Sequence, residues 1–317
     1  MNLGLEEYIF FYMIPERMLG KTGVMVSCLG LGGYHLGDVK TKREAIRIVQ
    51  EAVDHGITFM DNAWEYHDGL SEKIMGEALK GRRPKVCLMT KVCTHGRDKK
   101  TALKQLEQSL RRLKTDYLDL WQIHEVIYDN DPDLHFSKGN VIEALEEAKK
   151  QGKIRFTGFT GHKDPEILLK MLSHNYPFDT CQLPLNCFDA SFRSFEQRVL
   201  PELMARGIAV LGMKSLGGDG DAVKRRAVKV TDALRYAMSL PVATTISGID
   251  SMRVLRQNLR IANDFQPLSA AEMNRIRQQC LPFAFDGRFE LYKTSKMHDG
   301  PPGRKQHGFP SEDRVAL

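Results

Sequence analysis

Long hydrophobic runs are missing from this 317-residue sequence, as are the patterns of several common sites. No apolar stretch reaches the ~18 residues that a membrane-spanning helix needs. The six cysteines form no Cys-x-x-Cys pair and no His-Glu-x-x-His sequence occurs, so a metal site is not indicated and reduced core thiols are expected. No run of five like charges occurs, and a net charge of +6 is only mildly basic. We therefore expect no metal, no membrane and no nucleic-acid partner.

The rest of the composition is that of an ordinary folded domain. Hydrophobic residues make up 42% and charged residues 27% of the chain, as is typical of proteins with a large buried core. The first 15 residues contain one short apolar stretch, with two glutamates before it, no basic residue and no small-residue cleavage site. We therefore expect a cytoplasmic protein in which residues 1–16 form an N-terminal extension.

Strand and helix patterns alternate along most of the chain. A Gly-Lys-Thr-Gly turn at residues 20–23 separates two short segments, which predicts a β-hairpin. Short apolar segments then recur, and each is followed by a helical pattern. These predicted strands span residues 25–29, 57–60, 86–90, 118–123, 154–160, 178–183, 208–212 and 243–247. Eight repeats over about 240 residues favour a closed (β/α)8 TIM barrel in residues 17–282.

Capping residues predict several helix starts, where a Ser, Thr or Asp precedes a helical apolar pattern. A single helix is predicted for residues 195–205. The last stretch, residues 283–317, has no periodicity and is predicted to be a C-terminal loop or tail. Its segments 283–293 and 298–308 either close over a pocket or are disordered. The predicted N-caps are Thr41, Ser71, Asp164 and Ser269.

A doubly wound open sheet is the competing fold. Such a sheet usually carries Gly-x-Gly-x-x-Gly between its first strand and helix, with an acidic residue about 20 positions later. The glycines at positions 30, 32 and 33 lack that spacing. We interpret them as a tight strand-to-helix turn or as a weak phosphate-binding signal.

Four polar residues follow or end successive predicted strands. Asp61 comes after the second strand, Lys91 ends the third, and His124 ends the fourth, while Tyr66 lies in the loop after the second. The carboxyl ends of barrel strands meet at one mouth, so we expect these side chains to converge there. Each of them alone has an ordinary structural explanation, but the group of four indicates a site.

These residue types together suit the protonation of an oxygen. A tyrosine has a pKa near 10, and a cation at about 4 Å and an effective dielectric near 20 contributes about 4 kcal/mol, or roughly three pKa units. We therefore expect Lys91 to bring the Tyr66 phenol towards neutrality, with Asp61 holding Lys91 charged. His124 is expected to orient a substrate oxygen. Such a group protonates an alkoxide as it forms on a carbonyl carbon.

The chain resembles the aldo-keto reductase family in segments that run in order through residues 17–265. They include RMLGKTGVMVSCLGLGG at residues 17–33, GITFMDNAWEYHDGLSEKIMGEAL at residues 56–79 and DYLDLWQIH at residues 116–124. The resemblance implies a (β/α)8 barrel that reduces aldehydes and ketones with NADPH. It also implies that the family's catalytic tetrad falls on Asp61, Tyr66, Lys91 and His124.

The resemblance further implies a nicotinamide cofactor site along the mouth. Four positions depart from the family pattern: Gly161 replaces an asparagine, Met213 an aromatic residue, Lys214 a small residue and Val254 an arginine. The resemblance favours NADPH as the cofactor, and these departures keep NADH possible. Trp64 is expected to line the substrate pocket with Tyr66 and His124, with core packing as its alternative role. The implied cofactor-binding residues are Gly33, Tyr34, Asp61, Thr160, Gly161, Gln182, Met213, Lys214, Leu216, Gly218, Gly248, Arg253, Gln257 and Asn258.

Three functions are compatible with these observations. The leading hypothesis is an NAD(P)H-dependent carbonyl reductase with Tyr66 as the general acid, acting on a small-molecule carbonyl as a monomer or small homo-oligomer. The alternative is a low-turnover regulatory subunit that keeps the fold and the cofactor, against which the intact tetrad argues. An unrelated barrel, such as an isomerase or a lyase, would bind no nicotinamide.

Overall fold

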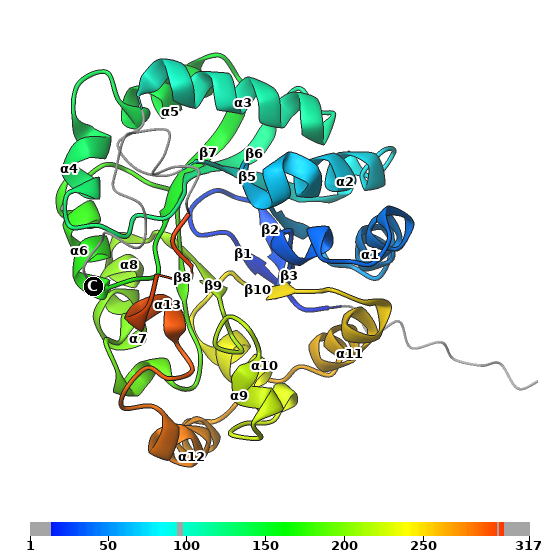
Figure 1. The fold of residues 1–317 in the computed structure, drawn as a ribbon, viewed down its shortest axis with the longest axis vertical. Coiled ribbons are helices and arrows are strands. Elements are labelled where there is room, and N and C mark those ends of the chain that lie inside the picture. Colours follow the sequence, from blue (N-terminus) through cyan, green and yellow to red (C-terminus); the bar gives the residue numbers. More distant parts are fainter. Residues whose placement is uncertain (1–13, 94–97, 297, 301–317) are drawn as a thin grey trace, which may run out of the picture.

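The computed structural model describes residues 14–93, 98–296 and 298–300, and its strands form a closed barrel (Figure 1). Eight parallel strands pair in the order β10-β3-β4-β5-β6-β7-β8-β9, which confirms the predicted (β/α)8 barrel. The strands are β3 (Leu29–Gly32), β4 (Phe59–Asp61), β5 (Cys87–Val92), β6 (Leu118–Ile123), β7 (Ile154–Thr160), β8 (Thr180–Pro184), β9 (Ala209–Met213) and β10 (Thr244–Gly248).

Helices surround the barrel on its outer side, with their apolar faces against the strands (Figure 1). Of the described residues, no helix is long and apolar enough to cross a membrane. The helices are α1 (Lys42–Asp54), α2 (Leu70–Ala78), α3 (Lys99–Leu113), α4 (Asp131–Phe136), α5 (Val141–Lys150), α6 (Pro165–Ser173), α7 (Phe195–Arg198), α8 (Leu200–Arg206), α9 (Asp221–Lys224), α10 (Val230–Ser239), α11 (Met252–Asn263), α12 (Ala270–Cys280) and α13 (Leu291–Thr294).

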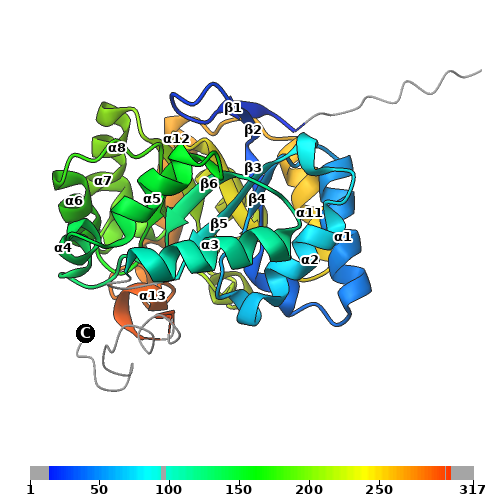
Figure 2. The same cartoon turned by 90° about the horizontal axis from the view of Figure 1, so that it is seen from above.

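The predicted N-terminal hairpin is present and closes one end of the barrel. Strands β1 (Glu16–Met18) and β2 (Met25–Ser27) pair antiparallel, and α13 lies at the opposite end of the molecule (Figure 2). Leu19 and Val26 of the hairpin are fully buried against apolar side chains that point into the barrel, such as Phe59. The hairpin therefore seals the amino ends of the strands and leaves the carboxyl ends for a site. Residues 1–13 of the predicted extension lie outside the described residues.

The expectation of one strand over residues 25–29 is wrong. The chain leaves the hairpin at Ser27 and enters the barrel at Leu29, so Gly30 and Gly32 lie within strand β3 and not in a turn after it. A Cβ on Gly30 would lie 3.1 Å from Thr244 Oγ1 and 3.2 Å from a ring carbon of Phe59. These glycines therefore serve close packing inside the barrel.

Three predicted N-caps are observed, and the fourth is wrong. Thr41, Asp164 and Ser269 each accept a hydrogen bond from a backbone N–H in the first turn of their helix. Ser71 instead lies buried inside α2, which begins at Leu70 after Gly69. Gly69 has φ of 83°, and a Cβ there would lie 2.5 Å from Nε of Arg112. The glycine therefore sets the helix start, because it alone fits this left-handed turn.

The single helix expected over residues 195–205 is also corrected by the structure. It divides into α7 and α8, with the break at Val199 and Pro201 in the first turn of α8. Proline lacks a backbone N–H, and its ring disfavours helical geometry in the residue before it. The chain therefore ends one helix and begins another within a continuous apolar pattern.

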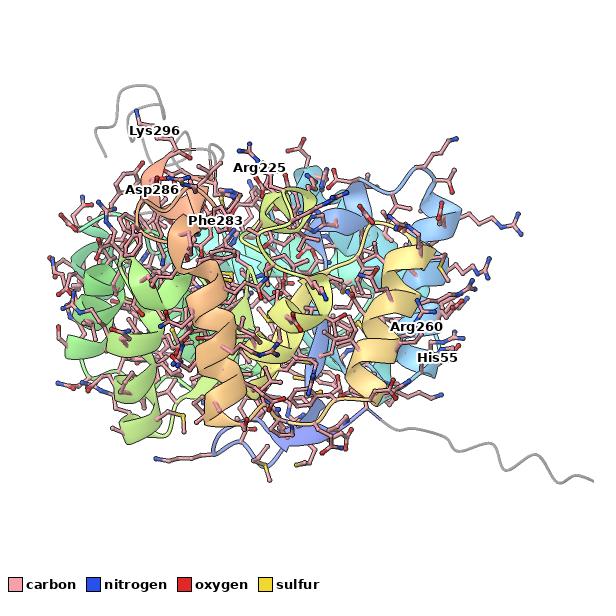
Figure 3. The ribbon with its side chains drawn as sticks, turned by 90° about the horizontal axis from the view of Figure 1, so that it is seen from below. His55, Arg225, Arg260, Phe283, Asp286 and Lys296 are labelled. Carbon is pink, nitrogen blue, oxygen red and sulfur yellow. The ribbon has the colours of Figure 1, made fainter. Side chains whose placement is uncertain are left out.

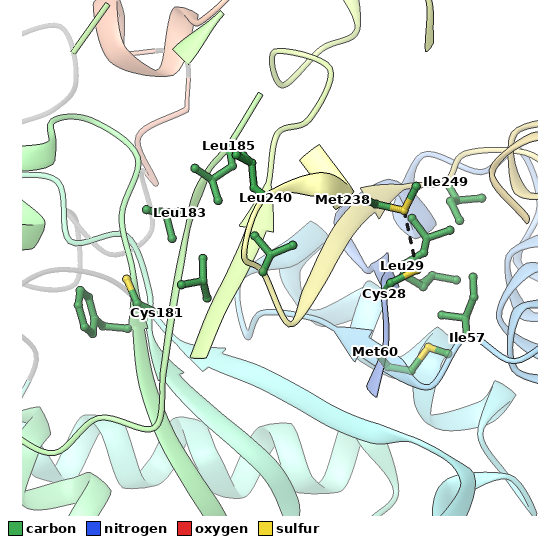
Figure 4. Packing of buried hydrophobic residues seen from close by; sticks show 14 of the residues in the cluster. Cys28, Leu29, Ile57, Met60, Cys181, Leu183, Leu185, Met238, Leu240 and Ile249 are labelled. Carbon is green, nitrogen blue, oxygen red and sulfur yellow. Dashed lines mark hydrogen bonds between the residues drawn. The ribbon is translucent and has the colours of Figure 1, made fainter. Parts of the chain in front are cut away.

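The main core lies between the strands and the surrounding helices (Figure 4). Cys28 Sγ lies 4.0 Å from Met238 Sδ of α10, and Leu29 packs in the same region. All six cysteines of the sequence are buried, and none is in a disulfide. This burial agrees with the expectation of core thiols, because a buried thiol behaves as a small hydrophobic group.

Replacing Gly158 by Ala is expected to lower the free energy of unfolding by about 1–3 kcal/mol, the usual cost of overpacking. A Cβ on Gly158 of β7 would lie 2.6 Å from the carbonyl oxygen of Thr180. Gly212→Ala in β9 is the matched control, since its nearest neighbour would be Val242 Cγ1 at 3.6 Å. Urea unfolding of both variants measures the difference. Equal midpoints for the two variants would contradict this packing.

The described part of the C-terminal stretch packs over the carboxyl ends of the strands. Lys293 of α13 is fully buried and forms ion pairs with Asp189 at 2.6 Å and with Glu290 at 2.9 Å. Asp299 forms a further ion pair with Lys163 at 2.7 Å. Figure 3 shows other residues of this stretch, Phe283, Asp286 and Lys296, at the end of the molecule that also carries Arg225. Residues 301–308 of the predicted covering segment lie outside the described residues.

Candidate active site

Lys91 is the centre of the polar group at the mouth. It lies in β5 with 1% of its surface exposed, and its ammonium contacts the carboxylate of Asp61 at the end of β4. The ammonium also donates to the carbonyl oxygen of Asn62 at 2.8 Å and lies 3.4 Å from the hydroxyl oxygen of Tyr66. The cation and the phenol are therefore adjacent at one rim of the barrel, as the sequence predicted.

His124 follows β6 and completes the group. Its ring lies edge-on to the ring of Tyr66, with 5.6 Å between centroids and an angle of 77°. Nδ1 of His124 contacts a carboxylate oxygen of Glu65, the residue before Tyr66, and Cys93 Sγ lies 3.0 Å from the other oxygen. Burial lowers the pKa of His124, and Glu65 opposes that shift. Sequence reasoning missed Glu65, although an acidic residue directly before the tyrosine was a visible signal.

The expectation of a near-neutral pKa for Tyr66 is wrong. Burial raises the pKa of this phenol well above its usual value, and the carboxylates of Asp61 and Glu125 raise it further. The Lys91 ammonium, which is paired with Asp61, does not reverse these contributions to the pKa of the phenol. The phenol therefore stays protonated over the physiological range and keeps the proton that a general acid needs.

Glu125 is a second carboxylate that sequence reasoning missed. It is buried directly after His124, with φ of 50°, a strained value for a residue other than glycine. Oε2 of Glu125 accepts a hydrogen bond of 2.7 Å from the backbone N–H of Gly300, 175 residues later in the chain. Burial and the neighbouring Glu65 raise the pKa of Glu125 well above its usual value. Strained backbone of this kind is concentrated at functional sites.

Lys214 lies after β9 with φ of 54°. Its ammonium lies 5.3 Å from the ring centroid of Tyr292 in the C-terminal stretch. Burial lowers the pKa of Lys214 to about 8, and Glu125 opposes that shift. Met213, half-buried, ends the strand before it, while Leu216 and Gly218 lie in the loop beyond. The loop after β9 thus brings a cation of reduced basicity to the mouth.

Thr160 and Gln182 pair side by side at the ends of β7 and β8. Oε1 of Gln182 is buried and accepts no hydrogen bond from any described residue. A buried amide oxygen without a donor fits a site that a bound molecule completes, such as a carboxamide N–H of a nicotinamide. A Cβ on Gly161 would lie 2.5 Å from the carbonyl oxygen of Val126, so the asparagine of the family pattern has no room here.

The remaining predicted cofactor residues lie around β3, β10 and α11. Asn258 Nδ2 donates to Ser247 Oγ at 3.0 Å, and Arg253 is exposed. Gly248 lies against the ring of His35, where a Cβ would clash. Tyr34 is 50% exposed, and its ring lies 5.3 Å from that of Tyr66. Gly33 precedes Tyr34, and Gln257 is half-buried on α11.

Trp64 is turned towards α3. Its indole N–H donates to Gln108 Oε1 at 2.7 Å, and the guanidinium of Arg112 lies 5.4 Å from its ring. The backbone N–H of Trp64 donates to the carbonyl oxygen of Lys91 at 3.1 Å. Trp64 therefore braces the loop that carries Tyr66, and its place in a substrate pocket stays a prediction.

The chain belongs to the aldo/keto reductase family, whose sequence profile matches residues 28–230. The fold, with its closed barrel and polar mouth, agrees with this membership. The protein is therefore an oxidoreductase, an aldo-keto reductase in class. Members of this class use nicotinamide cofactors.

Individual relatives are similar over most of the chain. An uncharacterized oxidoreductase of Bacillus subtilis, YqkF, is 29% identical over 78% of this chain and 91% of its own length. Methylglyoxal reductase YeaE of Escherichia coli is 29% identical over 65% of this chain and 70% of its own length. The aldo-keto reductase AKR11C1 from Bacillus halodurans in its holo form has a TM-score of 0.71 at 27% identity, covering 84% of this chain and 96% of that one.

A further solved structure of the same fold is a complex with a named cofactor. The aldo/keto reductase from Klebsiella pneumoniae, in complex with NADP and acetate, has a TM-score of 0.64 at 24% identity. The match covers 80% of this chain and 92% of the Klebsiella pneumoniae chain. At that identity the similarity concerns the fold.

Proposed function

We propose that this protein reduces an aldehyde or ketone with a hydride from NADPH, and that Tyr66 is the general acid. The observation that carries the proposal is the Lys91 ammonium held between Asp61 and the Tyr66 hydroxyl, 3.4 Å from the latter. Bound NADPH would supply the hydride. Membership of the family supports the choice of a nicotinamide cofactor.

The side chains at the mouth have separate tasks in this proposal. The raised pKa of Tyr66 keeps its proton in place until a substrate oxygen gains negative charge. When that proton leaves, the phenolate is stabilised by the Lys91 cation, which Asp61 keeps charged and aimed. His124, beside the Tyr66 ring, orients the substrate oxygen.

The cofactor would lie along the loops that follow β7 to β10. Gln182 offers its unpartnered Oε1 to the carboxamide, next to Thr160. Lys214 would face the pyrophosphate, and the exposed Arg253 a 2′-phosphate, which favours NADPH over NADH. We further propose a cytoplasmic location, small-molecule carbonyl substrates, and a monomer or small homo-oligomer.

The test has two measurements on the full chain. Fluorescence titration with NADPH and with NADH gives the two dissociation constants, and NADPH oxidation is followed with a panel of aldehydes and ketones. Tight NADPH binding with turnover on at least one carbonyl supports the proposal. Binding without turnover on any panel member would favour the regulatory-subunit hypothesis, and absence of nicotinamide binding would refute both.

The affinity for NADPH is expected to weaken as the pH rises through about 8. Burial lowers the pKa of Lys214 to about 8, so this ammonium loses its charge above that pH and no longer attracts the pyrophosphate. Titrations between pH 6.5 and 9.5 measure the effect. Lys214→Met should bind NADPH more weakly at pH 7 and show a flat profile. A wild-type affinity that is constant over this range would contradict the role of Lys214.

A further inference from the structure

Two buried carboxylates flank His124 and have no part in the proposed chemistry. Glu65 lies directly before Tyr66, and its side chain is 7% exposed, as is that of His124. Glu125 lies directly after His124. A Cβ on Gly300 would lie 2.5 Å from Oε2 of Glu125 and 3.2 Å from Oε2 of Glu65, so both acids converge on one part of the mouth. Of the two, Glu65 is the one that contacts the imidazole.

The contact between Glu65 and His124 decides where the imidazole carries its proton. A neutral imidazole has one N–H and one bare nitrogen, and a carboxylate can only accept a hydrogen bond. Nδ1 of His124 faces Oε1 of Glu65, so a neutral His124 holds its proton on Nδ1 while Glu65 is an ionised carboxylate. Any hydrogen bond between His124 and a substrate oxygen must then use Nε2.

We propose that Glu65 is a positioning residue that fixes neutral His124 as the Nδ1–H tautomer, so that Nε2 donates a hydrogen bond only when His124 is an imidazolium. A carbonyl oxygen has no hydrogen to offer and needs a donor at Nε2. An alcohol can donate to the bare Nε2 of the neutral ring. The Glu65–His124 pair thus favours a carbonyl when His124 is protonated and an alcohol when His124 is neutral. This consequence rests on the function proposed above.

The groups around the imidazole raise or lower the pKa of His124. Among the described residues, Glu65 favours the imidazolium, Lys91 in β5 opposes it, and Asp61 in β4 supports it more weakly. Burial is the largest influence and favours the neutral ring. Glu65 therefore acts in the direction of a charged His124, and its removal shifts the titration of His124 to lower pH.

The direct test is the tautomer of His124 in the protein without cofactor. Two-dimensional ¹H–¹⁵N spectra of histidine side chains distinguish a protonated ring nitrogen from a bare one, and the signals of His124 are those that vanish in His124→Gln. The wild type is expected to show a protonated Nδ1 and a bare Nε2 at neutral pH. A protonated Nε2 in the wild type would overturn the proposal, and this reading needs neither cofactor nor turnover.

Variants separate positioning from mere support of the fold. In Glu65→Gln we expect the pH at which His124 is half-protonated to fall by roughly one to three units, and the preference for Nδ1–H to weaken. Glu125→Gln is the matched control, since Glu125 binds Gly300 and not the imidazole, and should keep the wild-type tautomer. Equal spectra for Glu65→Gln and Glu125→Gln would refute the proposal. Should Glu65→Gln fail to fold, the wild-type spectrum still decides.

Turnover gives an independent readout. With the reductase active, the rate of carbonyl reduction in the wild type should fall as the pH rises through the titration of His124, and in Glu65→Gln this fall should occur at lower pH. An unchanged pH profile in Glu65→Gln would contradict the positioning role. If the wild type reduces no carbonyl yet shows the Nδ1–H tautomer, the proposed function fails while the role of Glu65 stands.

Discussion

Replacing Tyr66 by Phe is expected to lower kcat for carbonyl reduction by a factor of about 10²–10⁴, the usual contribution of a positioned general acid. The phenylalanine ring keeps the edge-on contact with His124 but has no proton to donate. The hydroxyl oxygen of Tyr66 lies 3.4 Å from the Lys91 ammonium, a long contact, so its loss should cost the fold about 1 kcal/mol or less. The variant should therefore fold and bind NADPH as the wild type does.

The comparison needs single-turnover rates with a reactive aldehyde, together with NADPH titrations. Tyr117→Phe is the matched control, because Tyr117 is 37% exposed and packs on Arg83 away from the mouth. It should reduce the aldehyde at the wild-type rate. If Tyr66→Phe reduces the aldehyde at the wild-type rate, another group must donate the proton to the substrate oxygen.

Replacing Lys293 by Met is expected to lower the free energy of unfolding by about 3–5 kcal/mol, the range for breaking a buried ion pair. Lys293 and its two partners, Asp189 and Glu290, have fully buried side chains. Its ammonium also donates to the carbonyl oxygen of Phe192 at 2.7 Å. Methionine would fill a similar volume but leave carboxylates in the interior without a counter-charge.

Urea unfolding at neutral pH measures this effect. The double variant Lys293→Met/Asp189→Asn should recover part of the loss, because it removes one of the unpaired charges. Lys224→Met is the control: Lys224 is 69% exposed in its ion pair with Asp221, and its loss should change stability by less than about 1 kcal/mol. If Lys293→Met loses no more stability than Lys224→Met, the buried ion pairs of Lys293 with Asp189 and Glu290 are dispensable for the fold.

Most of the barrel could be predicted from local patterns. Strands β6 and β7 begin and end where the apolar segments do, and the caps at Thr41, Asp164 and Ser269 are present. The errors lie where a local signal competes with a neighbouring element. Ser71 has the chemistry of an N-cap, but the left-handed turn at Gly69 starts the helix first.

The candidate site was predictable in part. The spacing of Asp61, Lys91 and His124 at strand ends is enough to bring them together, because parallel strands align their carboxyl ends. Glu125 could not be placed in the same way, since its partner Gly300 is 175 residues away in a stretch without periodicity. The direction of the Tyr66 pKa also escaped prediction, because burial outweighs a single nearby cation.

The sequence by itself determined the class of fold and the polar residue types at the strand ends, since both depend on residue types at short spacings. Only the tertiary structure decided which of these side chains are protonated. It does so through the burial of Tyr66, the contact of the Glu65 carboxylate with His124, and the C-terminal stretch that reaches Glu125. The physical reason is that desolvation and charge pairing depend on every group within a few ångströms, whatever its position in the chain.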